Sequence, residues 1–173
     1  MDLKPIFRQV PDFPKPGINF IDITTLLLNP TAFEWTIDAL AEPYIGQGIT
    51  KVVAIESRGF IFGAPLALKL NAGMTLLRKP NKLPADTYDQ SYDLEYGQAT
   101  LEVHKDGIEA GDKVMIIDDL LATGGTVEAA VQLMKKFDCA IVGISCVVEL
   151  TFLQGREKLA PYPVHSLVTY DSE

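Results

Sequence analysis

Two adjacent carboxylates follow an apolar run near the middle of the chain, in the stretch VMIIDDLLATGGT (residues 114–126). Like charges at Asp118 and Asp119 are tolerable only where the pair is solvated or binds something positive or rich in hydroxyl groups. Carboxylates at a strand end can accept hydrogen bonds from two vicinal hydroxyls, as on a ribose, and can help to hold a divalent cation. Two solvated loop aspartates are the simpler alternative, which the apolar run before them disfavours.

The segment after the aspartates has the composition of a phosphate-binding loop. Gly124 and Gly125 let backbone N–H groups approach an anion, and a helix that begins there points its positive end at the same place. Thr123 and Thr126 add hydroxyl donors. The sequence has no P-loop and no G-x-G-x-x-G motif, and this segment alone could equally be an ordinary strand-to-helix turn. Together with the acidic pair, it predicts a ribose 5-phosphate ligand.

Strands that alternate with helices must position these residues. The pattern predicts an α/β fold with right-handed crossovers and a central, mostly parallel sheet flanked by helices. The expected strands are residues 51–55, 74–78, 113–117, 140–148 and 164–170. Ligands of such sheets bind beyond the carboxyl ends of the strands, and Asp118 and Asp119 lie at one such end.

The expected helices follow from apolar spacing and capping residues. Apolar residues recur at helical spacing over residues 3–10, which predicts a short N-terminal helix. Asn29 followed by Pro30 predicts the start of a second helix. A third is expected over residues 62–70, and a fourth directly after Thr126.

Proline and glycine mark the irregular segments. Residues 11–20 should form an extended loop, and residues 79–90 are polar and broken by proline, so we expect them to be mobile. Two alternating runs, residues 91–96 and 98–105, flank Gly97 and predict an antiparallel hairpin.

Composition limits the function classes. The 173 residues suit one compact domain, and a net charge of −8 disfavours nucleic-acid binding. No apolar segment is long enough for a membrane span, and the N-terminus has no secretory pattern, so we expect a cytoplasmic protein. Cys139 and Cys146 are expected to be reduced thiols, with a disulfide as the minor alternative. His104 and His165 lack the spacing of a zinc site.

The stretch from Val114 to Thr126 resembles the phosphoribosyl pyrophosphate-binding motif of the type I phosphoribosyltransferases. Five further stretches are similar to the adenine branch of this family: DFPKPGINFIDIT, ESRGFIFGAPLA, LLRKPNKLP, YDLEYGQATLEV and VELTFLQGREKL. The resemblance runs in order from about Pro11 to the C-terminus. It implies one phosphoribosyltransferase domain over residues 1–173, with an N-terminal hood over about residues 1–30 and a hairpin lid over about residues 79–104.

The resemblance also implies an activity. The expected reaction, part of purine salvage, transfers the 5-phosphoribosyl group from phosphoribosyl pyrophosphate to adenine and gives AMP and pyrophosphate. Mg²⁺ would be required and held mainly by substrate oxygens and water, with no direct protein ligand expected. Members usually pair as homodimers. The alternatives are transfer to hypoxanthine, xanthine or orotate, and a non-catalytic regulator that senses phosphoribosyl pyrophosphate; the acidic chain has no room for an added DNA-binding domain.

By this resemblance, Asp118 and Asp119 would hold the ribose 2- and 3-hydroxyls. The 5-phosphate would bind to Ala122, Thr123, Gly124, Gly125 and Thr126. Leu120 and Phe20 would enclose the purine ring, and the backbone around Asn19, Phe20 and Ile21 would read its edge. Ile21 stands where many relatives carry a basic residue, and Asn19 where some carry a small apolar one, so the resemblance implies recognition through the backbone and no particular side-chain contact at these positions.

The resemblance places the remaining chemistry on charged residues. Arg58 would reach the pyrophosphate, and the Glu56–Ser57 peptide resembles one that the family often holds cis. Cations at Arg78, Lys79 and Lys82 would stabilise the departing pyrophosphate in the transition state. Glu95 matches the acid/base of the family at the purine N7. An arginine in a surface turn and a solvated basic loop are the alternatives for the cations, and a solvent-facing glutamate is the alternative for Glu95.

Overall fold

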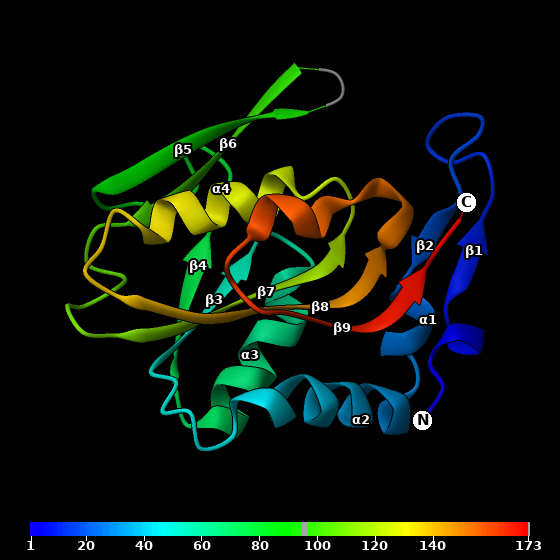
Figure 1. The fold of residues 1–173 in the computed structure, drawn as a ribbon, viewed down its shortest axis with the longest axis horizontal. Coiled ribbons are helices and arrows are strands. Elements are labelled where there is room, and N and C mark those ends of the chain that lie inside the picture. The colour runs from blue at the N-terminus through cyan, green and yellow to red at the C-terminus, as the bar shows by residue number, and fades with distance from the viewer. Residues whose placement is uncertain (95–96, 173) are drawn as a thin grey trace.

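The computed structural model describes residues 1–94 and 97–172 and shows one sheet between two layers of helices (Figure 1). The sheet contains five strands, which follow one another in space as β4 (Gly73–Leu77), β3 (Lys51–Ile55), β7 (Lys113–Leu121), β8 (Ala140–Leu150) and β9 (Val164–Tyr170). Every neighbouring pair is parallel. The predicted α/β fold with a parallel central sheet is confirmed.

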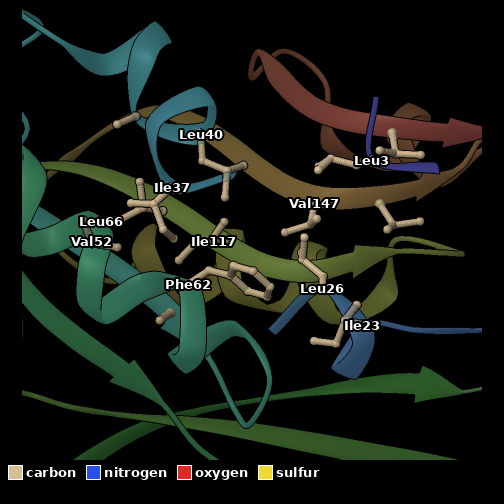
Figure 2. Close-up of a cluster of buried hydrophobic side chains, with 14 of the residues drawn as sticks. Leu3, Ile23, Leu26, Ile37, Leu40, Val52, Phe62, Leu66, Ile117 and Val147 are labelled. Carbon is tan, nitrogen blue, oxygen red and sulfur yellow. The ribbon is translucent and has the colours of Figure 1, made fainter. Parts of the chain in front are cut away.

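Each face of the sheet has its own core. Helices α2 (Pro30–Ala41) and α3 (Gly59–Leu70) cover one face, and α4 (Gly125–Met134) covers the other (Figure 1). Side chains of a strand alternate between the faces, so Ile117 of β7 packs with the first core and Ile116 with the second. Figure 2 shows the first core, where Leu40 of α2 and Phe62 of α3 approach Ile117.

The start of α2 follows the expected capping chemistry. Pro30 is its first residue, and the Asn29 side chain accepts a hydrogen bond from the Ala32 N–H at 3.1 Å. A short 3-10 helix, η2 (Glu42–Tyr44), follows α2, and the Tyr44 hydroxyl lies 2.9 Å from the Ser145 hydroxyl of β8. This contact joins the end of the helical layer to the sheet.

The predicted N-terminal helix is wrong beyond Ile6. A 3-10 helix, η1 (Lys4–Ile6), is followed by β1 (Arg8–Val10), which pairs antiparallel with β2 (Phe20–Asp22). The pairing partner lies ten or more residues away in the sequence, so a local apolar spacing could not reveal it. A short helix, α1 (Thr24–Leu27), follows β2.

The N-terminal elements pack beside the last strand of the sheet (Figure 1). The Lys4 ammonium lies 5.2 Å from the ring centroid of Tyr170 in β9. Leu3 and Ile23 are buried in the first core, as Figure 2 shows. The N-terminus is therefore fixed to the sheet close to the strand ends.

The predicted hairpin is confirmed, with different bounds. Strands β5 (Thr87–Leu94) and β6 (Gly97–His104) pair antiparallel along their full length. The strand begins at Thr87, so residues 87–90 are not part of the expected mobile loop. Backbone N–H groups of the loop also donate to β6, from Asn81 to the Glu102 carboxylate at 3.1 Å and from Ala85 to His104 Nε2 at 3.3 Å.

One end of the hairpin is anchored on α4. The rings of Tyr88 and Phe137 meet edge to face with centroids 5.3 Å apart, and Leu101 and Val103 are buried in the second core. These contacts join the part of the predicted lid near Thr87 and His104 to α4 and to the turn that follows it.

Two further observations concern the expected compartment. Cys139 and Cys146 are both free thiols, as predicted. Burial raises the pKa of the Cys146 thiol, so this side chain is an uncharged member of the second core. Among the described residues, no helix is long and apolar enough to cross a membrane.

Candidate active site

Strand β7 extends past its neighbour β3 and carries the acidic pair on the extension. The pairing of β3 with β7 ends at Ala54 and Ile117, whereas β8 stays paired to β7 as far as Leu121 and Glu149. The sequence predicted that Asp118 and Asp119 follow the strand; in the structure they lie within it. The β3 side of this extension is left open for a ligand.

A cavity of about 420 Å³ lies along this extension. Ten of its lining residues are among those that the sequence singled out: Arg58, Lys79, Asp118, Asp119, Leu120, Ala122, Thr123, Gly124, Gly125 and Thr126. Glu56, Ser57, Tyr92, Leu121 and Val127 complete the described lining. The structure therefore brings the acidic pair, the glycine-rich loop and two cations to one place.

The two aspartates have different partners. Asp119 is only 4% exposed, and its Oδ2 lies 2.6 Å from Nε of Arg58. Asp118 accepts a hydrogen bond from the Asp119 N–H at 2.9 Å. Burial, together with the negative charge of Asp119, raises the pKa of Asp118 well above its usual range. The pair therefore divides into one carboxylate neutralised by arginine and one carboxyl group that retains a proton readily.

The glycine-rich loop, residues 122–126, packs against the backbone of Gly155. Gly124 has φ +82° and caps α4; a Cβ on it would lie 2.4 Å from the Gly155 carbonyl oxygen. A Cβ on Gly155 would lie 2.1 Å from the Ala122 carbonyl oxygen. Gly155 begins the 3-10 helix η4 (Gly155–Leu159), which follows η3 (Thr151–Leu153). Only glycine at both positions permits this approach.

Gly155 and Tyr92 are site residues that sequence reasoning missed. Tyr92 of β5 lines the cavity, and its hydroxyl accepts a weak hydrogen bond from Thr126 at 3.4 Å. In the sequence, Tyr92 shows the alternation of a strand and begins the similar stretch YDLEYGQATLEV, which gave it no role. Gly155 was noticed solely as part of a similar stretch, although a glycine flanked by polar residues is itself a sign of a tight turn or close backbone approach.

The segment after β3 brings a carboxylate against the basic residues. The Glu56–Ser57 peptide is cis, as expected from the resemblance. Glu56 accepts hydrogen bonds from the Lys79 N–H at 2.9 Å and from Nε of Arg78 at 3.2 Å. Burial opposes ionisation of Glu56, but these two donors lower its pKa overall.

The three predicted cations do not share one environment. Arg78 is engaged by Glu56 and by the Lys82 carbonyl oxygen at 3.2 Å. Lys79 lines the cavity, whereas Arg78 and Lys82 are absent from its described lining. Arg78 therefore shapes the loop that carries Lys79.

The N-terminal segment contributes an aromatic ring. Phe20 meets Phe13 edge to face at 5.3 Å between centroids, and the Arg58 guanidinium lies 5.7 Å from the Phe20 centroid. Phe20 is thus next to a cavity residue without lining the described cavity itself. Asn19 donates a hydrogen bond to the Gln9 side chain at 3.0 Å. Ile21 is 7% exposed and packs in the first core, so its side chain is not available to a ligand.

Comparison with known proteins identifies the family. Residues 25–166 match the phosphoribosyl transferase domain family. The adenine phosphoribosyltransferase of Acaryochloris marina is 54% identical, over 98% of this chain and 100% of the relative. The chain belongs to the adenine phosphoribosyltransferase family. The predicted family and the predicted enzyme class are confirmed.

Solved structures of adenine phosphoribosyltransferases share the fold. The enzyme from Rhodothermus marinus has a TM-score of 0.92 at 51% identity, with 97% of this chain and 96% of that chain covered. The enzyme from Saccharomyces cerevisiae, complexed with adenine and an imino-altritol bisphosphate, has a TM-score of 0.90 at 40% identity, with 95% and 96% covered.

Two expectations of the adenine phosphoribosyltransferase resemblance stay predictions. Glu95, the predicted acid/base, and its neighbour Tyr96 lie outside the described residues. Among residues 1–94 and 97–172, no group of three or more His, Cys, Asp or Glu side chains could hold a metal ion. The Mg²⁺ requirement is the second expectation, and an ion bound in the cavity would need oxygen ligands from a substrate or from water as well.

Proposed function

We propose that this protein transfers the 5-phosphoribosyl group of phosphoribosyl pyrophosphate to adenine, giving AMP and pyrophosphate in purine salvage. The observation that carries the proposal is the cavity itself, which combines an acidic pair, a glycine-rich helix N-terminus and two cations. These features match the three polar parts of the sugar substrate: its diol, its 5-phosphate and its pyrophosphate. The names of the relatives favour adenine over other bases and over a non-catalytic regulator.

In this proposal the sugar lies along the β7 extension. Asp118 and Asp119 accept hydrogen bonds from the ribose 2- and 3-hydroxyls. The 5-phosphate is bound by N–H and hydroxyl donors of residues 122–126, at the positive end of the α4 dipole. Gly124 and Gly155 support this assignment, because their close contact leaves the loop backbone free of side chains at that point.

The pyrophosphate is bound by Arg58 and Lys79. As the bond from C1 of the sugar to pyrophosphate breaks, negative charge grows on the leaving group and the sugar becomes oxocarbenium-like. Cations at this end are worth more in the transition state than in the ground state. N9 of adenine forms the new bond to C1, and the proton on N7 passes to Glu95. The protein contributes mainly position and charge.

Adenine binds between Leu120 and the ring of Phe20, and the backbone of residues 19–21 reads its edge. Leu120 and Arg58 both line the cavity, and the Phe20 ring lies beside Arg58. The buried side chain of Ile21 supports recognition through the backbone. The replacement of a basic residue by isoleucine is then compatible with adenine binding.

We further propose a Mg²⁺ requirement, a homodimer and a cytoplasmic location. Mg²⁺ prefers oxygen ligands and pairs with phosphates, so the phosphates of the substrate would supply most of its ligands, with the carboxyl oxygens of the cavity close by. The exposed apolar side chains of Ile61 and Leu68 on α3, the latter 85% exposed, suit contact with a second copy. The two free thiols suit a reducing compartment.

Steady-state assays with adenine, hypoxanthine, xanthine and orotate, each with and without Mg²⁺, test this proposal. We expect turnover with adenine only, and only in the presence of Mg²⁺. Robust turnover of hypoxanthine and none of adenine would overturn the assignment of the base. Undiminished turnover after chelation of divalent cations would overturn the metal requirement alone.

A further inference from the structure

An ion pair between a buried carboxylate, Glu149, and a half-exposed guanidinium, Arg156, lies at the end of β8 beside the glycine-rich loop. Glu149 is 3% exposed. Its carboxylate accepts hydrogen bonds from Nε of Arg156 at 2.9 Å and from a second guanidinium nitrogen at 2.5 Å. The Ser166 hydroxyl of β9 donates to the same carboxylate at 2.6 Å. Arg156 also donates to the Val164 carbonyl oxygen at 2.7 Å. One carboxylate and one guanidinium thus join β8, β9 and η4.

This network adjoins the loop on two sides. In the sheet register Glu149 lies opposite Leu121, the residue that precedes Ala122. Arg156 directly follows Gly155, whose backbone packs against Ala122 and Gly124. Glu149 and Arg156 are nevertheless absent from the described lining of the cavity. Their effect on a ligand must pass through the loop.

The chemistry of the pair suits a positioning role better than a purely stabilising one. The Arg156 side chain is 47% exposed, and solvent reduces what such an ion pair contributes to stability. A bidentate arginine–carboxylate pair does fix orientation closely. The hydrogen bonds from Arg156 lower the pKa of Glu149, so the pair is fully ionised at neutral pH although burial opposes this.

We propose that Glu149, Arg156 and Ser166 are positioning residues that set the phosphate-binding geometry of residues 122–126 through the backbone of Gly155. The proposal rests on the proposed function, in which this loop binds the 5-phosphate. If the network loosens, η4 is free to retreat from Gly124, and the loop N–H groups lose their alignment. Misplacement by about 1 Å can reduce an enzyme's rate by about 100-fold.

The test compares two ligands that report on opposite ends of the cavity. Calorimetry with ribose 5-phosphate and, separately, with pyrophosphate is carried out on the wild type, Glu149→Gln, Arg156→Lys and the apolar double variant Glu149→Leu/Arg156→Met. We expect each variant to bind ribose 5-phosphate about 10- to 100-fold more weakly, while pyrophosphate binding changes less than about 3-fold. KM for phosphoribosyl pyrophosphate should rise, with KM for adenine nearly unchanged.

One control variant and the wild type keep the outcomes distinct. Lys69→Met breaks the exposed ion pair of Lys69 with Asp38, which is 2.6 Å long and joins α3 to α2, and should leave both ligands unaffected. Should the double variant fail to fold, the two conservative variants still decide. Equal weakening of both ligands, or of neither, would overturn the positioning role. A wild type that binds no ribose 5-phosphate would instead overturn the proposed function.

Discussion

The acidic pair divides its charge between two unlike carboxyl groups. Asp119 is neutralised by Arg58, whereas Asp118 is held beside a like charge in a poorly solvated place. Such an arrangement costs stability in the absence of a ligand and is retained where binding needs it. The sequence predicted the pair and its ligand class. It could not predict which aspartate Arg58 would neutralise, since that depends on how α3 meets the end of β7.

The raised pKa of Asp118 predicts a more stable variant. A folded-state pKa above the unfolded value means that stability falls as pH rises from about 4 through the folded pKa, so the cost is present at neutral pH. Asp118→Asn should therefore raise the free energy of unfolding at pH 7 by about 0.5–2 kcal/mol while weakening phosphoribosyl pyrophosphate binding. Thermal unfolding and calorimetry measure the two effects. Asp138→Asn, an exposed matched change, should alter neither, and a destabilised Asp118→Asn would contradict this reading.

Glu95 has a separate prediction. If it exchanges a proton with the purine N7, Glu95→Gln should lower kcat by about 100-fold or more and leave phosphoribosyl pyrophosphate binding within a few-fold of the wild type. Steady-state kinetics with calorimetry separates these effects, and Glu34→Gln on the exposed side of α2 is the matched control. Turnover equal to that of the wild type would remove Glu95 from the reaction.

Among the secondary-structure elements, the strands were the most predictable. The predicted bounds of β3 and β9 are correct to the residue, although only β3 is largely buried. The strand pairing of β1 with β2 replaced the expected N-terminal helix, since it depends on a distant partner. The contact of η4 with the glycine-rich loop was equally hidden, because about thirty residues of α4 and β8 separate Gly124 from Gly155.

Gly124→Ala tests that contact. A Cβ at this position meets the Gly155 carbonyl oxygen at 2.4 Å, so we expect a loss of about 2 kcal/mol or more in stability and a large loss of phosphoribosyl pyrophosphate affinity. Gly111→Ala is a close control, since φ is +85° there and nothing lies within 4 Å of the added Cβ. It should show only the backbone strain, about 1 kcal/mol, with normal kinetics. Equal behaviour of the two variants would show that the close approach is unimportant.

Over residues 1–94 and 97–172, hydrogen-bonded carboxylates set the response to acid. The pKa values of Asp22, Glu56, Asp112 and Glu149 are all lowered by their hydrogen-bond donors, whereas that of Asp118 is raised. The first group contributes stability that is present above the unfolded pKa values near 4 and is lost as pH falls through the folded ones. Because most of these carboxyl groups have a lowered pKa, a pH below about 4 favours unfolding.

Glu149→Gln should isolate the contribution of one carboxylate to the loss of stability in acid. The variant should be less stable than the wild type at pH 7, because Arg156 loses its partner. It should also lose less stability between pH 5 and pH 3, because one titrating carboxyl group is gone. Chemical unfolding at a series of pH values measures how the free energy of unfolding of each protein changes with pH. Parallel curves for the two proteins would show that Glu149 does not contribute to acid sensitivity.

The position of Ile21 has a consequence for protein engineering. Its side chain is enclosed by the first core, and its backbone pairs with Gln9 of β1 in the segment that is proposed to meet the nucleobase. A library that varies this one side chain would then mostly alter folding yield, with little effect on the choice of base. Retargeting the enzyme to a different purine would require a new main-chain path between β1 and α1, which is a problem of loop grafting.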